Sequence, residues 1–347
     1  MNRANVAVGR VLFLFATCST FFVAGMICLM YAKNGRGVIL SKSLAKSGVG
    51  SSKSPVESVQ ECPWVGISNG AFLTLKSRML EERRNLMQNQ KRVYVQHQFK
   101  CGGSTLCKFF RMSNLSTPNT HNCNGEEDLR RITNGSVEEL EEYLLNKPYQ
   151  VVFNEKRLFG TDLPVDKFIF VTTSREPVSR LVSAMLQTWQ DLEVDDKGIV
   201  KNLTEHVESF LEHGTRNGKT SHVPQNPQVL NLAGVPKSSA GDWFSLYNQA
   251  LHNLQQFTFT IPTDELKEGL EYLGRFFGQE VVEKMESTQG NFRDAASQVL
   301  HLQRRNPELL HRIEMENRYD RCVYNQVVAL WKAQQQALDE ILEEHNE

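Results

Sequence analysis

Short apolar runs alternate with segments of helical periodicity through the middle of the chain. Three runs are rich in β-branched and aromatic residues, which predicts buried strands: RVYVQH (92–97), YQVVFN (149–154) and KFIFVTT (167–173). Helical spacing occupies the segments around them: 71–88, 105–112, 136–146 and 177–192. Strands separated by helices predict an α/β fold in which helices flank a parallel sheet.

Helix-start signals support this division. Ser136 stands before an apolar-periodic run with Glu139 three residues later, the pattern of a capping box. Pro177 opens the segment 177–192, and proline is favoured in the first turn of a helix. The carboxy-terminal third is expected to be mostly helical and to end in the long periodic segment 325–345.

The amino-terminal part has a different pattern. Residues 11–31 carry no charge over 21 positions, which is long enough to cross a bilayer. A cleaved signal peptide is the alternative, with Ala24 and Gly25 before the cut, but the apolar run continues beyond them. Residues 33–60 are rich in Gly, Ser and Lys and lack apolar periodicity, as in a flexible stem. We therefore predict a short cytosolic tail (1–10), a transmembrane signal anchor (11–31), a stem (32–60) and a lumenal domain (61–347).

Sequons and cysteines bear on the compartment. Three Asn-x-Ser/Thr triplets follow the apolar segment, at Asn114, Asn134 and Asn202, and together they favour a glycosylated lumenal domain and a type II orientation. Cys18 and Cys28 lie in the apolar segment and fit there as small apolar residues.

Five cysteines remain in the predicted lumenal domain: Cys62, Cys101, Cys107, Cys123 and Cys322. Because five is odd, at most two disulfides form and one thiol is left over, with the pairing open. No CxxC or Cys/His spacing indicates zinc, and no metal is expected.

The charge is unevenly distributed. Residues 1–60 hold seven of the 39 Lys/Arg and one of the 40 Asp/Glu, so residues 61–347 carry about −7 formally. This charge excludes a large basic field of the kind that binds nucleic acid. An anionic ligand would have to be held by local geometry.

Such geometry is predicted after the first strand, where the chain reads HQFKCGGSTL. Gly102 and Gly103 allow main-chain N–H groups to converge on an anion, and the following helix adds its positive end. Ser104 and Thr105 add hydroxyl groups, and Lys100 adds a full charge. The sequence matches neither G-x-x-x-x-G-K-[ST] nor G-x-G-x-x-G. An ordinary β–α turn is the alternative to a phosphate or sulfate site.

A second candidate anion site follows the strand 167–173, in the sequence REPVSRLVS. Arg175 stands at the strand end, where its guanidinium is placed for a bidentate phosphate contact. Ser183 lies two turns into the next helix, and the helical phase predicts that it faces the same pocket.

Two anion sites on neighbouring strands make this chain resemble the Golgi membrane-bound carbohydrate sulfotransferases, which use 3′-phosphoadenosine 5′-phosphosulfate (PAPS). HQFKCGGSTL is similar to the family's first loop, roughly Pro-Lys-Thr-Gly-Gly-Thr-[ST]-Leu after a strand ending in histidine, and REPVSRLVS is similar to Arg-Asp-Pro-Val-x-Arg-x-x-Ser. Later segments are similar to the heparan sulfate O-sulfotransferase branch: NPQVLNLAG (226–234), 250–273 and 317–331. The resemblance covers about residues 90–335.

The resemblance implies a role for each matched residue. Lys100 would stabilise the charge on the leaving oxygen, and the amides and hydroxyls of residues 102–105 would hold the 5′-phosphate. Arg175 and Ser183 would hold the 3′-phosphate. Phe99, Cys101 and Glu176 depart from the family's proline, threonine and aspartate. Cys101 loses a hydroxyl, and its thiol is a candidate for the unpaired one.

The general base is the open point. Related enzymes commonly place a histidine, sometimes a glutamate, after the strand that corresponds to 149–154. Here NEKRLFG follows, without a histidine. Glu155 is the first candidate, and pairing with Lys156 or Arg157 is its alternative role. His97 and His222 are further candidates.

The resemblance also implies a Golgi membrane location and a glycosaminoglycan-like acceptor, with 6-O transfer on heparan sulfate ahead of 2-O transfer. Basic residues near the two motifs are candidates to line the acceptor cleft: Lys108, Arg111, Arg130, Arg131, Lys156 and Arg157. A non-catalytic lumenal protein that binds nucleotide or glycan is the alternative function. A glycosyltransferase ranks third, since no Asp-x-Asp motif is present.

Overall fold

The computed structural model divides the chain into two compact units, Met1–Gln60 and Glu61–Glu347. It describes residues 62, 66–88, 90–113, 115–123, 142, 145–155, 163–189, 191–213, 225–235, 242–278 and 294–345, all in the second unit. The predicted tail, anchor and stem lie outside the described residues. Among the helices that are described, none is both long and apolar enough to cross a membrane.

Four parallel strands form the central sheet in the order β2-β1-β3-β4. They are β1 (Arg92–Gln96), β2 (Val151–Asn154), β3 (Phe168–Ser174) and β4 (Phe259–Pro262). The predicted parallel α/β sheet is confirmed. We did not predict β4, although its sequence FTFTIP has the alternation and β-branched content of a strand.

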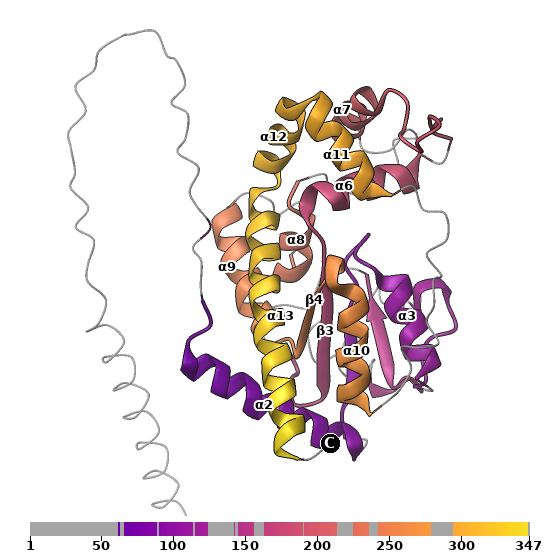
Figure 1. The fold of residues 1–347 in the computed structure, drawn as a ribbon. Helices are drawn as coiled ribbons and strands as arrows, with labels where there is room; N and C mark the ends of the chain where they lie inside the picture. Colours follow the sequence, from indigo (N-terminus) through magenta and orange to yellow (C-terminus); the bar gives the residue numbers. More distant parts are fainter. Residues whose placement is uncertain are drawn as a thin grey trace, which may run out of the picture. The chain divides into compact units, whose positions relative to one another are not determined.

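Both faces of the sheet are covered, which explains why the strands are almost continuously apolar. Val95, Val171 and Ile261 point into one core, against α3 (Gly103–Met112), α10 (Leu266–Phe277) and α2 (Asn69–Met87). Tyr94 and Phe170 point into the opposite core, against α8 (Pro227–Ala233) and α9 (Trp243–Leu254). The long helix α13 (Arg318–Glu344) contributes to both cores (Figure 1).

A third apolar cluster contains no strand residue and lies above the end of the sheet where β3 leads into α6 (Figure 1). Its helices are α6 (Pro177–Thr188), α7 (Leu203–His213), α11 (Ala295–Arg305) and α12 (Pro307–Glu316). Two short 3-10 helices complete the described elements, η1 (His121–Cys123) and η3 (Thr263–Glu265).

The predicted helices at 71–88, 105–112 and 177–192 are confirmed, with shifted boundaries. The first loop is shorter than expected, because α3 already begins at Gly103. The segment 177–192 ends its helix at Thr188. Most of 136–146, including Ser136 and Glu139, lies outside the described residues.

The five cysteines of the second unit form two disulfides and leave one thiol, as expected. Cys62 pairs with Cys322 and Cys107 pairs with Cys123, while Cys101 is free and buried. The first bridge ties the segment before α2 to α13, and the second ties α3 to η1. Closing the longer loop stabilises the fold by about 2–5 kcal/mol.

Candidate functional site

The predicted chemistry gathers at the carboxyl edge of the sheet. His97 follows β1, Glu155 follows β2 and Arg175 follows β3, and Lys100 lies in the turn between β1 and α3. Since all strands are parallel, these residues emerge at one edge, where α/β sheets place their ligands. The two motifs that the sequence separates by about 75 residues are therefore neighbours.

The turn after β1 is tight, and its two glycines are required by close approach. Gly102 has a φ of 83°, and a Cβ there would lie 2.6 Å from Leu266 Cδ2 of α10. At Gly103 a Cβ would lie 1.8 Å from His97 Nε2, so the imidazole rests on the bare Cα. Lys100 also adopts a left-handed conformation, with a φ of 65°. His97 thus shapes the turn as a packed, buried residue.

The amino terminus of α3 is uncapped. Gly102 occupies the N-cap position and offers no side chain to the first N–H groups. Thr105 and Leu106 donate back to the Gly102 carbonyl at 3.0 and 3.1 Å. Gly103 and Ser104 precede them, and the first N–H groups of a helix have no acceptor within it. This end of α3 is therefore suited to an external anion.

The predicted hydroxyl donors of this turn differ in availability. Ser104 is exposed, and its hydroxyl donates to Asn122 Oδ1 in η1. Asn122 holds a φ of 59° next to the Cys107–Cys123 disulfide. Thr105 is half-buried in the first turn of α3. An anion would receive the Ser104 hydroxyl only in exchange for its bond to Asn122.

The turn after β3 meets the first turn through Arg175. The guanidinium Nη1 of Arg175 donates to the Lys100 carbonyl at 3.4 Å. Its Nε is buried and has no hydrogen-bond partner in the described part of the chain. A buried guanidinium nitrogen without an acceptor is costly, so an external anion at this position would stabilise it.

Gln228 of α8 holds the main chain of this second turn. Its Oε1 accepts from Ser174 Oγ at 2.8 Å and from the Arg175 N–H at 3.2 Å. Its Nε2 donates to the Arg175 carbonyl at 2.9 Å. The thiol of Cys101 also lies 3.7 Å from Oε1. One buried amide therefore contacts both turns.

The amino terminus of α6 is closed by its own side chain. Glu176 accepts from the N–H groups of Val178 and Ser179 at 3.1 and 2.7 Å, and it pairs with Arg321 at 2.7 Å. Ser183 lies in α6 on the same half-exposed strip as Ser179, four residues on. No hydrogen bond joins Ser183 to Arg175 in the described part of the chain, so their predicted convergence stays a prediction.

Charges concentrate around Lys100. Burial lowers the pKa of Lys100, the neighbouring Arg175 lowers it further, and Glu155 acts in the opposite direction. Glu155 Oε1 lies 4.0 Å from His97 Nδ1, and the Glu155 side chain is 26% exposed against 4% for His97. Two of the candidate general bases, Glu155 and His97, thus lie side by side, and the Glu155 side chain is the more accessible of the two. Burial raises the pKa of Cys101 to about 12, so its thiol stays protonated at neutral pH.

Several other predicted residues fall elsewhere. His222 and the basic residues Arg130, Arg131, Lys156 and Arg157 lie outside the described residues. The Arg111 guanidinium donates to the carbonyls of Pro118 and Thr120, at 3.0 and 2.7 Å, and so braces the segment before η1. Lys108 is half-buried in α3.

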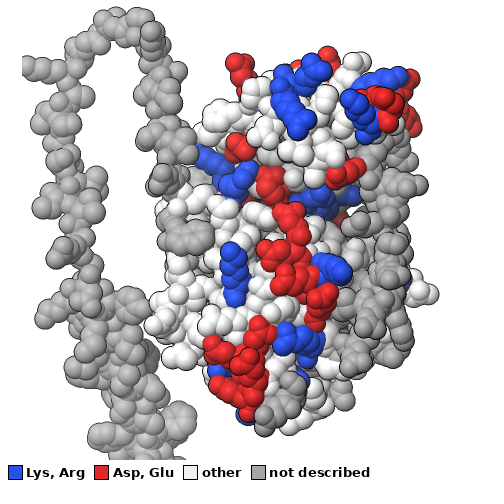
Figure 2. All heavy atoms as spheres, viewed as in Figure 1, with Lys and Arg blue, Asp and Glu red and all other residues white. Residues whose placement is uncertain are grey.

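Acidic side chains form a band over α10 and α13 on the face that Figure 2 shows. Those two helices carry Glu268, Glu271, Asp339, Glu340, Glu343 and Glu344 on partly or fully exposed positions. Lys76 pairs with Glu340 and Glu344, and Arg275 pairs with Asp339, so the band is partly neutralised, but its remaining carboxylates are unsuited to a polyanion. Within the described residues, no group of three or more His, Cys, Asp or Glu is arranged to hold a metal.

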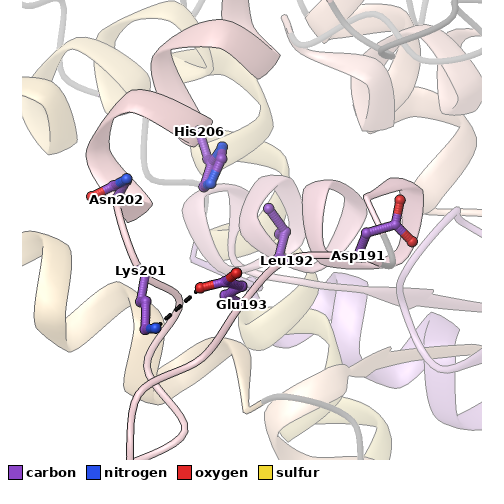
Figure 3. A pocket seen from close by; sticks show the side chains of 6 residues that line it. All are labelled: Asp191, Leu192, Glu193, Lys201, Asn202 and His206. Carbon is purple, nitrogen blue, oxygen red and sulfur yellow. Dashed lines mark hydrogen bonds and ion pairs between the residues drawn. The ribbon is translucent and has the colours of Figure 1, made fainter.

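A cavity of about 560 Å³ lies apart from these turns (Figure 3). It is lined by Asp191, Leu192, Glu193, Lys201, Asn202 and His206. Lys201 pairs with Glu193 at 3.0 Å, so the one cation in its wall is already neutralised. Two carboxylates in the wall make it a poor anion site, and none of the predicted site residues lines it.

Sequence reasoning missed Gln228 and Asn122. Gln228 stands in NPQVLNLAG, a segment noted only for its family likeness, and nothing in its local pattern marks the contact with Arg175. Asn122 precedes Cys123, and its left-handed φ is typical of asparagine in turns.

A scan against protein-family models, and searches of curated proteins and of solved structures, return no match to this chain.

Proposed function

We propose that this chain is a sulfotransferase that moves a sulfuryl group from PAPS to a hydroxyl of a glycan. One observation carries the proposal: the uncapped start of α3 and the Arg175 guanidinium adjoin, through the bond from Arg175 Nη1 to the Lys100 carbonyl. A nucleotide with phosphates at both 5′ and 3′ positions offers two anions to two such neighbouring donors. PAPS is such a nucleotide and carries the group to be transferred.

Each donor group has a distinct task in this proposal. The N–H groups that open α3 bind the 5′-phosphosulfate, with the Thr105 hydroxyl beside them. Arg175 binds the 3′-phosphate, which satisfies its Nε and forms a charge-assisted contact. Ser183 is a further 3′-phosphate ligand by resemblance. The same proposal includes a more specific description of the fold, in which a strand–turn–helix unit of the parallel α/β sheet binds PAPS.

The transfer step places charge where Lys100 lies. The acceptor oxygen attacks the sulfur, and the bond from sulfur to the bridging phosphate oxygen breaks. The electron pair leaves on that oxygen, which Lys100 stabilises as an ammonium ion. The acceptor hydroxyl loses its proton to Glu155, which neighbours both His97 and Lys100.

The acceptor is proposed to be glycosaminoglycan-like, with 6-O transfer on heparan sulfate ahead of 2-O transfer. The −7 charge of residues 61–347 and the acidic band on α10 and α13 repel a polyanion at long range. Attraction near Lys100 and Arg175 acts within about 8 Å at physiological salt. Binding is therefore expected to be weak and strongly salt-dependent.

A labelled-PAPS assay on desulfated glycosaminoglycans, neutral glycans and peptide tyrosine tests the proposal. We expect transfer to glycosaminoglycans, no detectable transfer by Lys100→Ala, and a lower turnover with unchanged donor affinity in Glu155→Gln. Transfer confined to neutral glycans or tyrosine would refute the acceptor class alone. Nucleotide binding without transfer to any acceptor would favour the non-catalytic alternative.

The proposed setting is the Golgi membrane, with the anchor at 11–31 and residues 61–347 in the lumen. Asn202 of the third sequon is exposed immediately before α7, where a glycan could be attached. Glycosidase treatment should lower the apparent mass of the protein from cells. In sealed vesicles, residues 61–347 should resist added protease, and their digestion would refute the orientation.

A further inference from the structure

We propose that Gln228 is a positioning residue for Arg175, which it holds in the orientation that selects a 3′-phosphorylated nucleotide. This inference rests on the proposed function and adds to it a residue for which no role follows from the sequence. Gln228 does not touch the ligand in this account. It acts through the main chain of Arg175.

The sheet itself cannot hold Arg175. β3 ends at Ser174, which lies opposite Pro262, the last residue of β4. Proline has no N–H to donate, and Pro177 follows on the other side of Arg175 at the start of α6. The main chain of Arg175 therefore lies just beyond the last paired residue of β3.

Gln228 supplies the missing strand-like contact. Its amide accepts from the Arg175 N–H at 3.2 Å and donates to the Arg175 carbonyl at 2.9 Å, which is the pair of bonds a neighbouring strand would make. The same Oε1 accepts from Ser174 Oγ at 2.8 Å. A two-point contact fixes both position and rotation of the peptide, and thereby the direction in which the Arg175 side chain leaves.

Gln228 is itself firmly placed. It is 1% exposed and sits at the start of α8, where its N–H and that of Val229 donate to Asp320 at 3.2 and 2.9 Å. In return, Asn226 Oδ1 accepts from the N–H groups of Tyr319 and Asp320, both at 3.0 Å. The starts of α8 and α13 thus cap each other.

Gln228 also reaches the other turn, because the Cys101 thiol lies 3.7 Å from the oxygen that accepts from Ser174 and Arg175. Cys101 immediately precedes Gly102, the N-cap of α3. The spacing between the two anion-binding turns is therefore set in part by one side chain. A ligand with two phosphates is sensitive to that spacing, whereas a ligand with one phosphate is not.

The test compares two nucleotides on the full-length protein by calorimetry. Adenosine 3′,5′-bisphosphate uses both turns, and adenosine 5′-monophosphate uses only the start of α3. In Gln228→Met, which keeps the volume and removes the amide, we expect the bisphosphate to bind about tenfold more weakly, the loss of one charge-assisted contact. The monophosphate affinity should stay unchanged, which also shows that the variant is folded.

Gln334 provides a matched control. It is a buried glutamine of α13 that likewise binds strand main chain: Oε1 accepts from the Thr260 N–H at 2.8 Å, within β4. Gln334→Met should lower the melting temperature as Gln228→Met does, yet preserve the preference for the bisphosphate. A purely structural role for Gln228 predicts the same behaviour for both variants.

Two further variants keep the inference testable if Gln228→Met does not fold. Gln228→Glu retains the acceptor for Ser174 and Arg175 and lacks the donor to the Arg175 carbonyl, so its preference should be intermediate. In an Arg175→Ala background, either Gln228 variant should cause no further loss of preference. An unchanged preference in both Gln228 variants would overturn the inference alone. A wild-type protein that binds neither nucleotide would overturn the proposed function.

Discussion

The molecule contains two strand–turn–helix units of the same topology at one sheet edge, β1 to α3 and β3 to α6, and they treat the helix start in opposite ways. α3 starts at Gly102 with no side chain capping its N–H groups. α6 starts with Glu176, whose carboxylate occupies the N–H groups of Val178 and Ser179. An external anion can use the main chain of the first unit and only the Arg175 side chain of the second.

It follows that the main chain of a strand–turn–helix unit is open to an external anion only when its own sequence leaves the helix start uncapped. The macrodipole is present in both units. In α6 the carboxylate of Glu176 caps the positive end of the macrodipole and also pairs with Arg321. In α3 no side chain of the described residues caps the helix start, and the neighbouring Lys100 and Arg175 add positive charge there.

The largest effect is expected from filling the first turn. In Gly103→Ala the new Cβ would overlap the buried His97 ring, because the ideal position of that Cβ lies 1.8 Å from His97 Nε2. We expect loss of detectable nucleotide binding and a fall of about 1–3 kcal/mol in the free energy of unfolding. Gly70→Ala is the control, because no atom lies within 4 Å of a Cβ there. Nucleotide binding by Gly103→Ala at wild-type affinity would show that this turn is not the site.

Removing the charge of the second unit should have the next largest effect. Arg175→Ala should weaken adenosine 3′,5′-bisphosphate binding by about 1.5–3 kcal/mol, the value of a charge-assisted contact. Arg321→Ala is a matched control, because Arg321 is a nearby arginine that pairs with Glu176 and Glu314. If Arg175→Ala binds as tightly as wild type, the 3′-phosphate is not held by this unit.

A smaller effect concerns pH and separates Lys100 from the main-chain donors. The pKa of Lys100 is lowered in the free protein, first by burial and then by Arg175. A bound phosphate favours the ammonium form and raises that pKa, so binding takes up a proton and the affinity falls as pH rises through the range in which Lys100 loses its proton. The phosphate itself does not titrate there, since its second pKa is about 6.

Calorimetry in buffers of different ionisation enthalpy measures this proton uptake. Lys100→Arg stays charged throughout and should bind without taking up a proton. Equal proton uptake in wild type and Lys100→Arg would show that another group titrates.

The smallest effect is expected from opening the second helix start. Glu176→Ala removes the cap of α6 and should lower the free energy of unfolding by about 0.5–2 kcal/mol. Added sulfate should recover part of this loss, because the exposed N–H groups can then bind an anion. Thermal unfolding with and without sulfate measures this recovery. Asp294→Ala is the corresponding variant of α11, because Asp294 is the N-cap of that helix. A variant as stable as wild type would mean that Glu176 does not cap α6 effectively.

Local patterns are enough to predict the parallel sheet, the turn after β1 and the position of Arg175 just after β3. Contacts between distant segments were not predictable. Gln228 meets Arg175 across 53 residues of sequence, and Glu155 lies beside His97 only because β2 pairs with β1. β4 was overlooked because its short apolar run lies between two strongly helical segments. Knowledge of which distant segments lie side by side, and not composition, would have supplied these features.

We propose that the two units together bind one nucleotide that carries phosphates at both the 3′ and the 5′ position of its ribose. Calorimetric titration of the wild-type protein with adenosine 3′,5′-bisphosphate tests it most directly. We expect one site per chain, with tighter binding than that of adenosine 5′-monophosphate. Absence of both binding heat and thermal stabilisation at millimolar nucleotide would contradict it.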